Sequence, residues 1–456
     1  MKNMLRPFPL LCILALLWGN TNHNTLTAQT NYGRQGDWFI VNKGDAASLL
    51  AAIDAAKTVN GAKIFLPDGT YDLGETVKTV IAGKNVSLIG QSAEKTVIRN
   101  APPVTMEGLD QADLLKNTSQ GLYMQDLTLR NDLDYYHHTG NAGRAVTLHD
   151  KGTKTVCKNV IHLSYQDTYY SHKEGGLYYH EGGEIHGLVD YMCGSGRAYF
   201  NRVTMVNEKH STAATMTANS ELYVFNECIV KSRADKYNFG RAWNNTPVCV
   251  WLNTTLEEPR KLIATRWNLK GIAVDYSVAG EYGTKNTGGQ NITPAKNEIT
   301  FAKQNTKMNT ILSADEAALY TIDYVLGDWA ATAQQSTIQL PPPADAKYAD
   351  GQVTFGLTDN GMTACALFKN GQFLALSTDG TFPGIVINPA TDVLTIRTAN
   401  QRGGFGPEGH VAGTATSSIT PVNSGAPHAA IHDLRGYPVS KTHHGLYIVN
   451  GRKVMM

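Results

Sequence analysis

The chain has 456 residues, a formal net charge of +1 and 42% hydrophobic residues. This length and composition are enough for one large hydrophobic core and a smaller second one. The balanced charge excludes a general nucleic-acid-binding surface, because lysine and arginine are scattered rather than gathered along one face. Binding to an acidic polymer would therefore need a local basic patch.

The first residues have the composition of a secretory signal. Lys2 and Arg6 precede an apolar run at residues 10–18, and a polar stretch then ends in Leu-Thr-Ala at 26–28. The apolar run is too short to span a bilayer comfortably. We therefore interpret residues 1–28 as a signal peptide rather than as a membrane anchor.

Residues 38–332 predict a parallel β-helix. A short helix is expected at 45–57, where apolar residues recur at helical spacing behind Asp45. Short β-rich runs separated by Gly, Asn and Asp turns follow it, at 63–66, 86–89, 122–129, 145–148, 160–163, 185–189, 203–206, 223–230 and 248–252. Such runs with no helix between them suit stacked coils, each of which needs its neighbours to bury an apolar face. A β-sandwich is the alternative for this pattern.

A second, smaller domain is expected after the coils end near Trp329. Residues 333–347 contain a proline run typical of a linker. Residues 348–413 alternate apolar and polar positions around the hairpin signal Asn370-Gly371, and they predict a small antiparallel β-sandwich. A linker rich in Ser, Thr, Pro and Gly follows at 414–430, and 431–456 form a short β tail.

Three ionisable residues at equal spacing mark a candidate active site. Arg144, Asp167 and Asp190 are each 23 residues from the next. One coil of a β-helix has about this length, so we expect the three at the same phase, with neighbouring strands about 4.8 Å apart. A single Asp at a coil corner more often caps a turn. Two carboxylates stacked so closely would perturb each other's pKa values, which is typical of a functional site.

Short motifs in the same region resemble the pectinesterase family, the pectin methylesterases. The motifs are YQDT at 165–168, VDYMCG at 189–194 and GRAW at 240–243, in this order and at coil spacing. The segments PDGTY, VSLIGQ, KTVIRN and LYMQDLTLRN extend the resemblance over about residues 38–332. It implies a right-handed parallel β-helix that removes methyl groups from homogalacturonan-like pectin, with no metal or organic cofactor.

The resemblance also implies roles for individual residues. Asp190 would be the nucleophile, and Asp167 would protonate the departing methanol and then take a proton from the hydrolytic water. Gln166 would donate a hydrogen bond to the oxyanion. Arg241 would bind Asp190 and hold it ionised, and Trp243 would offer an apolar face to a sugar ring.

Two tyrosines are further candidates for substrate binding: Tyr191, next to the nucleophile, and Tyr136, in the tyrosine-rich groove region. Tyrosines stack on sugars, although strand tyrosines with a wet hydroxyl are the more common case.

Arg144 departs from the family pattern, which usually has a glutamine there as a second oxyanion donor. A full charge about 4 Å from Asp167 would be worth roughly 4 kcal/mol at an effective dielectric constant of 20, and it would favour the ionised state, which cannot act as a general acid. Three outcomes stay open. Arg144 swings out to bind free carboxylates of the substrate, which we favour; or catalysis is slowed or shifted to lower pH; or the substrate differs. If the charge does act in this way, Arg144→Gln would raise activity near neutral pH.

The cysteines and histidines do not predict a metal site. The cysteines after the leader are odd in number and show no spacing typical of zinc: Cys157, Cys193, Cys228, Cys249 and Cys365. We interpret them as small core residues, although one pair could bridge in an oxidising compartment. His172, His180 and His186 are spaced for successive strand or loop positions rather than for a ligand triad.

The tail at 431–456 resembles the C-terminal sorting modules of proteins secreted by Bacteroidetes-type bacteria, through DLRG, GLYIVNG and its closing basic and apolar residues. It predicts a monomer that is secreted, periplasmic or attached to the cell surface; the last hairpin of the sandwich is the alternative. Two other functions stay open: a catalytically impaired pectin-binding surface protein, or a pectate lyase or polygalacturonase on the same fold. Neither the calcium-binding acidic cluster of a lyase nor the further paired Asp motifs of a hydrolase is evident.

Overall fold

The computed structural model describes residues 32–135, 143–209, 212–303, 305–416, 431–432, 446–449 and 452–455. The predicted signal peptide and Tyr136 lie outside the described residues. Within them, none of the helices is both long and apolar enough to cross a membrane.

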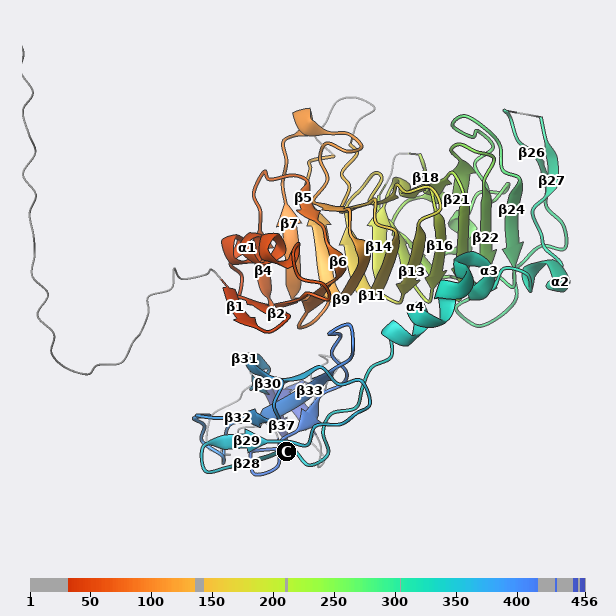
Figure 1. Cartoon of the computed structure of the whole chain (residues 1–456). Coiled ribbons are helices and arrows are strands. Elements are labelled where there is room, and N and C mark those ends of the chain that lie inside the picture. Colours follow the sequence, from red (N-terminus) through yellow and green to blue (C-terminus); the bar gives the residue numbers. More distant parts are fainter. Residues whose placement is uncertain are drawn as a thin grey trace, which may run out of the picture. The chain divides into compact units, whose positions relative to one another are not determined.

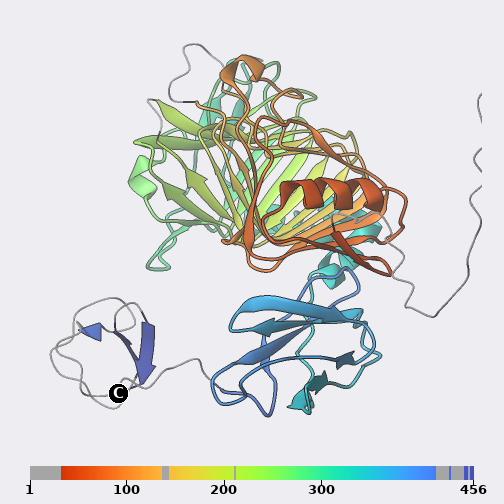
Figure 2. The same cartoon turned by 90° about the vertical axis from the view of Figure 1, so that its left-hand side faces the viewer.

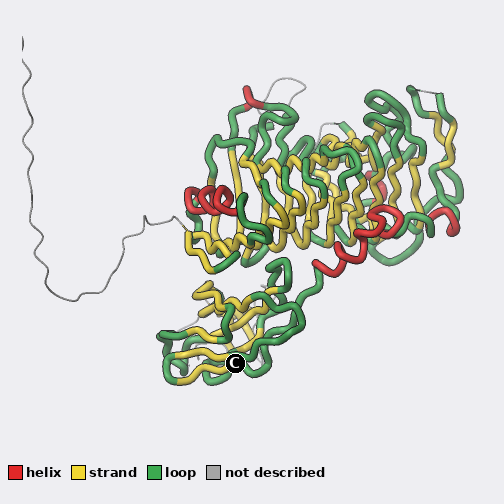
Figure 3. The backbone as a smooth tube through the Cα atoms, in the orientation of Figure 1, coloured by secondary structure: helices red, strands yellow, loops and turns green. Residues whose placement is uncertain are grey.

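The described chain is mainly β-structure (Figure 3). The first strands are β1 (Tyr32–Gln35), β2 (Trp38–Val41), β3 (Lys63–Leu66), β4 (Gly69–Asp72), β5 (Thr79–Ile81), β6 (Lys84–Gly90), β7 (Thr96–Asn100), β8 (Leu115–Asn117), β9 (Gln120–Asn131), β10 (Leu148–Asp150), β11 (Lys154–Leu163), β12 (Tyr169–Ser171), β13 (Leu177–Glu181), β14 (Glu184–Gly187) and β15 (Val189–Gly194). The next are β16 (Arg197–Asn201), β17 (Thr204–Asn207), β18 (Ala213–Asn219), β19 (Leu222–Asn226), β20 (Ile229–Ser232), β21 (Lys236–Ala242), β22 (Val248–Leu252), β23 (Thr255–Leu256), β24 (Val278–Tyr282), β25 (Lys285–Asn286), β26 (Glu298–Thr300) and β27 (Lys307–Asn309).

The remaining strands are β28 (Lys347–Ala349), β29 (Gln352–Thr354), β30 (Ala364–Lys369), β31 (Gln372–Ser377), β32 (Thr381–Phe382), β33 (Leu394–Ala399), β34 (Gly409–His410), β35 (Ile431–His432), β36 (Leu446–Val449) and β37 (Arg452–Met455). The helices are α1 (Ala46–Ala56), α2 (Ala314–Ala317), α3 (Ile322–Leu326) and α4 (Ala330–Ser336), with single 3₁₀ turns at η1 (Val104–Met106), η2 (Pro259–Lys261) and η3 (Gly327–Trp329).

Three parallel stacks of strands form the β-helix (Figure 1). The first follows β2, β3, β6, β9, β11, β13, β16, β19, β22 and β24. The second begins with β4 and β7, shares the long strands β9 and β11, and continues through β14, β17, β20, β23 and β25. The third is a separate sheet in the order β5, β8, β10, β12, β15, β18 and β21. The predicted parallel β-helix is confirmed; its right-handed sense stays a prediction from the chirality of parallel crossovers.

Aromatic side chains at equivalent positions of successive coils fill the interior. His180, Phe200, Phe225 and Trp251 follow one another in strict register. The ring centroids of Phe225 and Trp251 lie 3.8 Å apart and those of Phe200 and Phe225 lie 4.6 Å apart, with nearly parallel planes. Stacking of like residues on adjacent rungs buries each ring on both faces and so favours one register.

The helix α1 lies across the first coil and closes that end of the core (Figure 2). Its N-cap Asp45 accepts a hydrogen bond from the backbone N–H of Ser48 at 3.1 Å, as the sequence predicts. Leu49, Ala52 and Ile53 face the interior and are buried there. The apolar stripe of the helix thus replaces the missing preceding coil.

Several predicted strands need correction. The run at 145–148 is not a strand, because β10 begins only at Leu148 and a single bridge joins Arg144 to Gln166 before it. The runs at 185–189 and 223–230 each divide into two strands at a coil corner, the second where Glu227 takes a φ of 53°. Hydrophobic alternation does not reveal such breaks, because the apolar pattern continues through the corner.

The coils do not continue to Trp329. A hairpin of β26 and β27 follows β25, and the helices α2, α3 and α4 occupy residues 314–336. Ser313 and Glu316 form a reciprocal capping box at the start of α2, a signal that was present in the sequence. Buried residues of these helices pack on the outer face of the first stack, among them Ala317, Val325, Leu326, Ala330 and Ala333.

Two small antiparallel sheets share a second core after the helices. One contains β28, β29 and β32, and the other contains β31, β30, β33 and β34. Val353 and Phe382 of the first sheet pack with Leu367 and Ile396 of the second. The hairpin turn at Asn370-Gly371 is confirmed, with φ values of 51° and 77°, as a type I′ turn requires. The described parts of the tail, β35 to β37, pair in a three-stranded antiparallel sheet.

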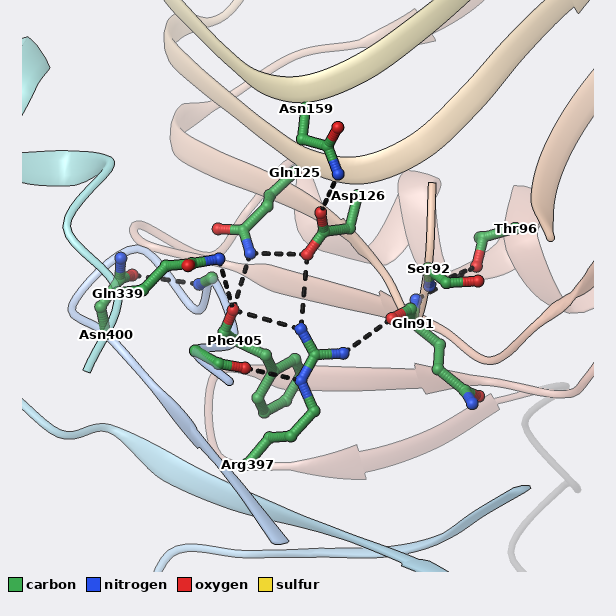
Figure 4. A network of polar contacts seen from close by, with 12 residues as sticks. Gln91, Ser92, Thr96, Gln125, Asp126, Asn159, Gln339, Arg397, Asn400 and Phe405 are labelled. Carbon is green, nitrogen blue, oxygen red and sulfur yellow. Dashed lines mark hydrogen bonds and ion pairs between the residues drawn. The ribbon is translucent and has the colours of Figure 1, made fainter. Parts of the chain in front are cut away.

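The four-stranded sheet is fixed to the β-helix through the guanidinium of Arg397 (Figure 4). It donates hydrogen bonds to the carbonyl oxygens of Gln91 and Gly406, both at 2.7 Å, and lies 3.5 Å from the Asp126 carboxylate. Both side chains of the ion pair are nearly buried. Next to them, the ring of Phe405 packs on Trp38 and Phe65 of the outer face.

We expect Arg397→Ala to lower the free energy of unfolding by about 2–4 kcal/mol, because it leaves a buried carboxylate without its cation. Urea unfolding followed by tryptophan fluorescence measures this. Lys369→Ala is the matched control in the same sheet, since its ion pair with Asp392 is more exposed and should contribute much less to stability. Equal losses in the two variants would contradict the role given to Arg397.

Candidate active site

The two predicted catalytic carboxylates lie at equivalent positions of adjacent coils. Gln166 bridges Val189 in parallel, the backbone N–H of Asp167 donates to the carbonyl of Val189 at 3.1 Å, and β12 continues in register with β15. Both aspartates also have left-handed backbone, with φ values of 55° for Asp167 and 50° for Asp190. The predicted spacing of one coil is therefore confirmed for this pair.

Both carboxylates are buried, with only 5% of Asp167 and 4% of Asp190 exposed. Burial and the negative charge of Asp190 raise the pKa of Asp167 well above its usual value. Burial also raises the pKa of Asp190, but hydrogen bonding and the charge of Arg241 oppose that rise. Of the two, Asp167 therefore holds the proton that the pair shares.

A guanidinium clamps the second carboxylate. Arg241, at the end of β21, donates from Nε to Oδ1 of Asp190 at 3.0 Å and from Nη2 to Oδ2 at 2.5 Å. Such a bidentate pair fixes the plane of the carboxylate and favours its ionised form. The structure thus brings Arg241 to Asp190 across the intervening strand β18, as the sequence predicts.

An unpredicted thiol contacts the first carboxylate. The Cys193 side chain hydrogen-bonds to Asp167, and burial raises the pKa of the thiol well above its usual value. A neutral thiol is a weak donor, so it helps to fix the carboxyl orientation. Cys193 occupies the same register column as Tyr170, Ala218 and Arg241. This column runs along the outer face beside the carboxylates.

An aromatic face lies next to the pair. The half-buried Trp243 packs on Tyr170, with ring centroids 5.9 Å apart, and both belong to a small apolar cluster with Cys193 and Ala218. Flat apolar surface beside polar groups is typical of a site for sugar rings. Trp243 thus lies where an apolar face for a sugar ring was expected, and Tyr170, which was not predicted, lies beside it.

Arg144 is out of phase with the two aspartates by one residue. It bridges Gln166, not Asp167, because the coil between them has 22 residues at that point and 21 at the Leu148–Tyr169 pair. Its guanidinium forms a fork with Glu107, from Nε to Oε2 at 3.0 Å and from Nη2 to Oε1 at 2.8 Å. Binding of a substrate carboxylate by Arg144 would require this pair to open.

The surroundings of Asp167 bear on the expectation that Arg144 keeps this carboxyl ionised. The charge of Arg144 does lower the pKa of Asp167, but burial and Asp190 outweigh it, and the net shift is upward. Glu107 carries the opposite charge beside Arg144, and the hydrogen bond from Arg144 lowers the pKa of Glu107. Glu107 lies in a loop with no fixed spacing to the catalytic coils, so sequence reasoning had no signal for it.

Of the remaining predicted residues, Gln166 fits its expected role, Tyr191 does not, and Tyr136 is not described by the structure. The half-buried side-chain amide of Gln166 has no hydrogen-bond partner among the described residues, so its donors are free for a substrate. Tyr191 is fully buried in the interior core and donates to Asn207. Its assignment to substrate binding is wrong, because neighbours along a strand face opposite sides and Asp190 faces outward. Tyr136 lies outside the described residues.

An open hollow of about 610 Å³ borders Arg241 and is lined by Lys270, Gly271, Ile272, Ala302 and Lys303. Its two lysines are exposed. They provide the local basic patch that an acidic polymer would need.

The chain also matches known proteins. Residues 41–293 match the model of the pectinesterase family. An Arabidopsis thaliana protein named "Probable pectinesterase/pectinesterase inhibitor 64" is 27% identical over 272 residues, which cover 52% of this chain but only 43% of the plant protein. A pectin methylesterase from Aspergillus niger in deglycosylated form has a TM-score of 0.50 at 19% identity, over 67% of this chain and 98% of that chain. A pectin methylesterase in complex with a hexasaccharide has a TM-score of 0.48 at 21% identity, over 61% and 92%.

Fold and site together define a parallel β-helix protein with a paired-carboxylate centre. Because the matched residues make up more than half of the chain, it belongs to the pectinesterase family of carboxylic ester hydrolases.

We expect Glu107→Gln to lower the pKa of Asp167, because the charge of Arg144 would then act on the carboxyl without its counter-ion. Carboxyl ¹³C NMR titration, with Asp167→Asn to identify the signal, measures the shift. Adding Arg144→Gln should restore the original pKa, whereas Glu184→Gln, which breaks a contact to His186, should leave it unchanged. A pKa that does not move in Glu107→Gln would show that Glu107 does not screen Arg144.

Proposed function

We propose that this protein hydrolyses the methyl esters of homogalacturonan-like pectin and releases galacturonate and methanol, with Asp190 as nucleophile and Asp167 as acid and base. The observation that carries the proposal is the asymmetry of two neighbouring buried carboxylates. Arg241 binds one of them, while the other is raised in pKa. Such separation of two pKa values assigns an acid and a base to one site.

In the first step the Asp190 carboxylate attacks the ester carbonyl carbon. The oxyanion that forms accepts a hydrogen bond from the free amide of Gln166. As the tetrahedral intermediate collapses, the C–O bond to the methoxy group breaks and Asp167 gives its proton to the departing methanol. The product is an acyl anhydride between Asp190 and the galacturonate carboxyl carbon.

In the second step a water molecule attacks that anhydride. Asp167 is now a carboxylate, and it takes the proton from the water as the new C–O bond forms. Cleavage of the bond to Asp190 returns its carboxylate to Arg241, and Asp167 is protonated again. The acid and base roles of Asp167 thus alternate within one turnover.

Substrate binding is assigned to the surfaces beside the pair. Trp243 and Tyr170 would carry a sugar ring, and the hollow with Lys270 and Lys303 would attract free carboxylates of neighbouring galacturonate units. The presence of a basic hollow next to an ester-cleaving pair favours a partly de-esterified, acidic substrate.

The assignment of Asp190 predicts that Asp190→Asn lowers methanol release from esterified pectin by roughly 10³-fold or more, with an unchanged circular dichroism spectrum. Asp235→Asn, an exposed change close to β21, should retain full activity. Full activity in Asp190→Asn would refute the nucleophile. Unsaturated oligosaccharides from the wild type would indicate a lyase, and retention of unaltered pectin would indicate a binding protein.

Arg241→Gln should move the acid limb of the pH–rate profile for methanol release to higher pH, by about 1–3 units. The sign follows because removal of the cation raises the pKa of Asp190, which then stays protonated and inactive up to a higher pH. Profiles of kcat/KM measure the limb. Arg233→Gln, which breaks an exposed pair with Glu208, is the control, and an unmoved acid limb in Arg241→Gln would contradict the clamp.

We also propose that the protein acts outside the cytoplasm, as a secreted or surface-attached monomer. The composition of residues 1–28 and the resemblance of 431–456 to sorting modules support this.

A further inference from the structure

A cysteine and two histidines meet inside the β-helix, away from the catalytic pair. Cys157 in β11 pairs in register with His180 in β13, and His162 lies further along β11 beyond the corner at Asn159, where φ is 50°. The cysteine sulfur and one ring nitrogen of each histidine all lie within 4.8 Å of one another. Three side chains of ligand type therefore converge from two coils.

These histidines have polar atoms that the described part of the protein leaves unsatisfied. Nε2 of His162 and Nε2 of His180 have no hydrogen-bond partner there, although His162 is 0% and His180 is 2% exposed. Buried polar atoms in folded proteins almost always have a hydrogen-bond partner, so two unsatisfied atoms in one cluster need an explanation. A shared ligand would satisfy both.

The tautomer of one histidine is set for ligation. The Thr147 hydroxyl donates to the carbonyl of Thr168 at 2.7 Å, so its oxygen accepts from Nδ1–H of His162 at 2.9 Å. This leaves the Nε2 lone pair of His162 free. A hydrogen bond on the far nitrogen is the usual support of a metal-bound imidazole.

Packing holds the rings in place. Phe200 stacks on His180 with centroids 4.7 Å apart, and the edge of Tyr169 meets His180 at 4.6 Å. Both rings belong to the interior core with Cys157. The ligands are thus fixed before any ion arrives, which lowers the entropic cost of binding.

We propose that Cys157, His162 and His180 bind one d¹⁰ metal ion, Zn²⁺ or Cu⁺, as a structural site within the β-helix. Thiolate and imidazole are the ligands that these ions share. Binding displaces the thiol proton of Cys157 to solvent with no change of oxidation state.

Charge balance distinguishes the two ions. A thiolate with two neutral imidazoles gives a neutral complex with Cu⁺ and a complex of charge +1 with Zn²⁺. The fully buried Asp150 lies near the cluster, because Tyr169, which packs against His180, also donates to the Asp150 carboxylate at 3.4 Å, so an ionised Asp150 can compensate the charge of Zn²⁺. The spacing of cysteines and histidines along the chain did not indicate this site. Cys157 and His162 lie on the two sides of a corner in β11, and His180 lies on the next coil in β13.

The test uses the full chain, purified without chelator and analysed by mass spectrometry for metals. We expect about one zinc or copper ion per chain after gel filtration in EDTA. The protein is unfolded in chelator and then refolded with or without metal. Refolding with Zn²⁺ or Cu⁺ should raise the melting temperature by about 5 °C or more over refolding without metal. The ion that gives the larger rise is the one that the site prefers. Refolding with Co²⁺ should give a thiolate charge-transfer band.

Cys157→Ser and His180→Ala should lose the ion and the metal-dependent shift, whereas Cys228→Ser, a matched change at another buried free cysteine, should keep both. The refolding experiment and the Co²⁺ spectrum use only the wild-type protein, so they test the proposal even if a variant fails to fold. Native protein without metal, together with a melting temperature that neither ion changes, would overturn the proposal.

Discussion

The hydrogen-bond register between successive coils is the constraint on which this structure depends. Parallel pairing of Gln166 with Val189 sets Asp167 and Asp190 on the same outer face, and the same ladder carries Arg241 to within two strands of them. A slip of one residue would turn every side chain of a rung to the opposite face. The interior aromatic stack resists such a slip. The packing of the core therefore also fixes the positions of the site residues.

Electrostatics then separates two residues of the same type. Arg241 hydrogen-bonds to Asp190 and lowers its pKa, whereas burial and the charge of Asp190 raise the pKa of Asp167 against the weaker effects of Arg144 and Arg241. Glu107 pairs with Arg144, so a negative charge lies beside the arginine that approaches Asp167. In this chain Arg144 and Glu107 therefore have to be considered together, and the sequence motif contains only the first of them.

Features that follow the coil repeat could be predicted from the sequence, whereas features in loops without a repeat could not. The phase of Asp167 and Asp190 followed from the coil length, and Arg241 followed from a family motif. Strand alternation would have excluded Tyr191 from the outer face once Asp190 was placed there, so that error was avoidable. Glu107 could not be predicted, because a loop without periodicity brings it to the site. The C-terminal helices were missed although a capping box marked their start at Ser313.

The apolar outer face of the first stack has a practical consequence for anyone who trims this protein. The family model stops at residue 293, yet Trp38, Phe65 and Tyr123 on the early coils are covered by residues from the far end of the chain, including Phe405. Truncation to the matched region would expose a continuous apolar surface on the β-helix. Exposed apolar surfaces promote self-association and poor solubility, so the C-terminal segments shield this face of the β-helix from solvent.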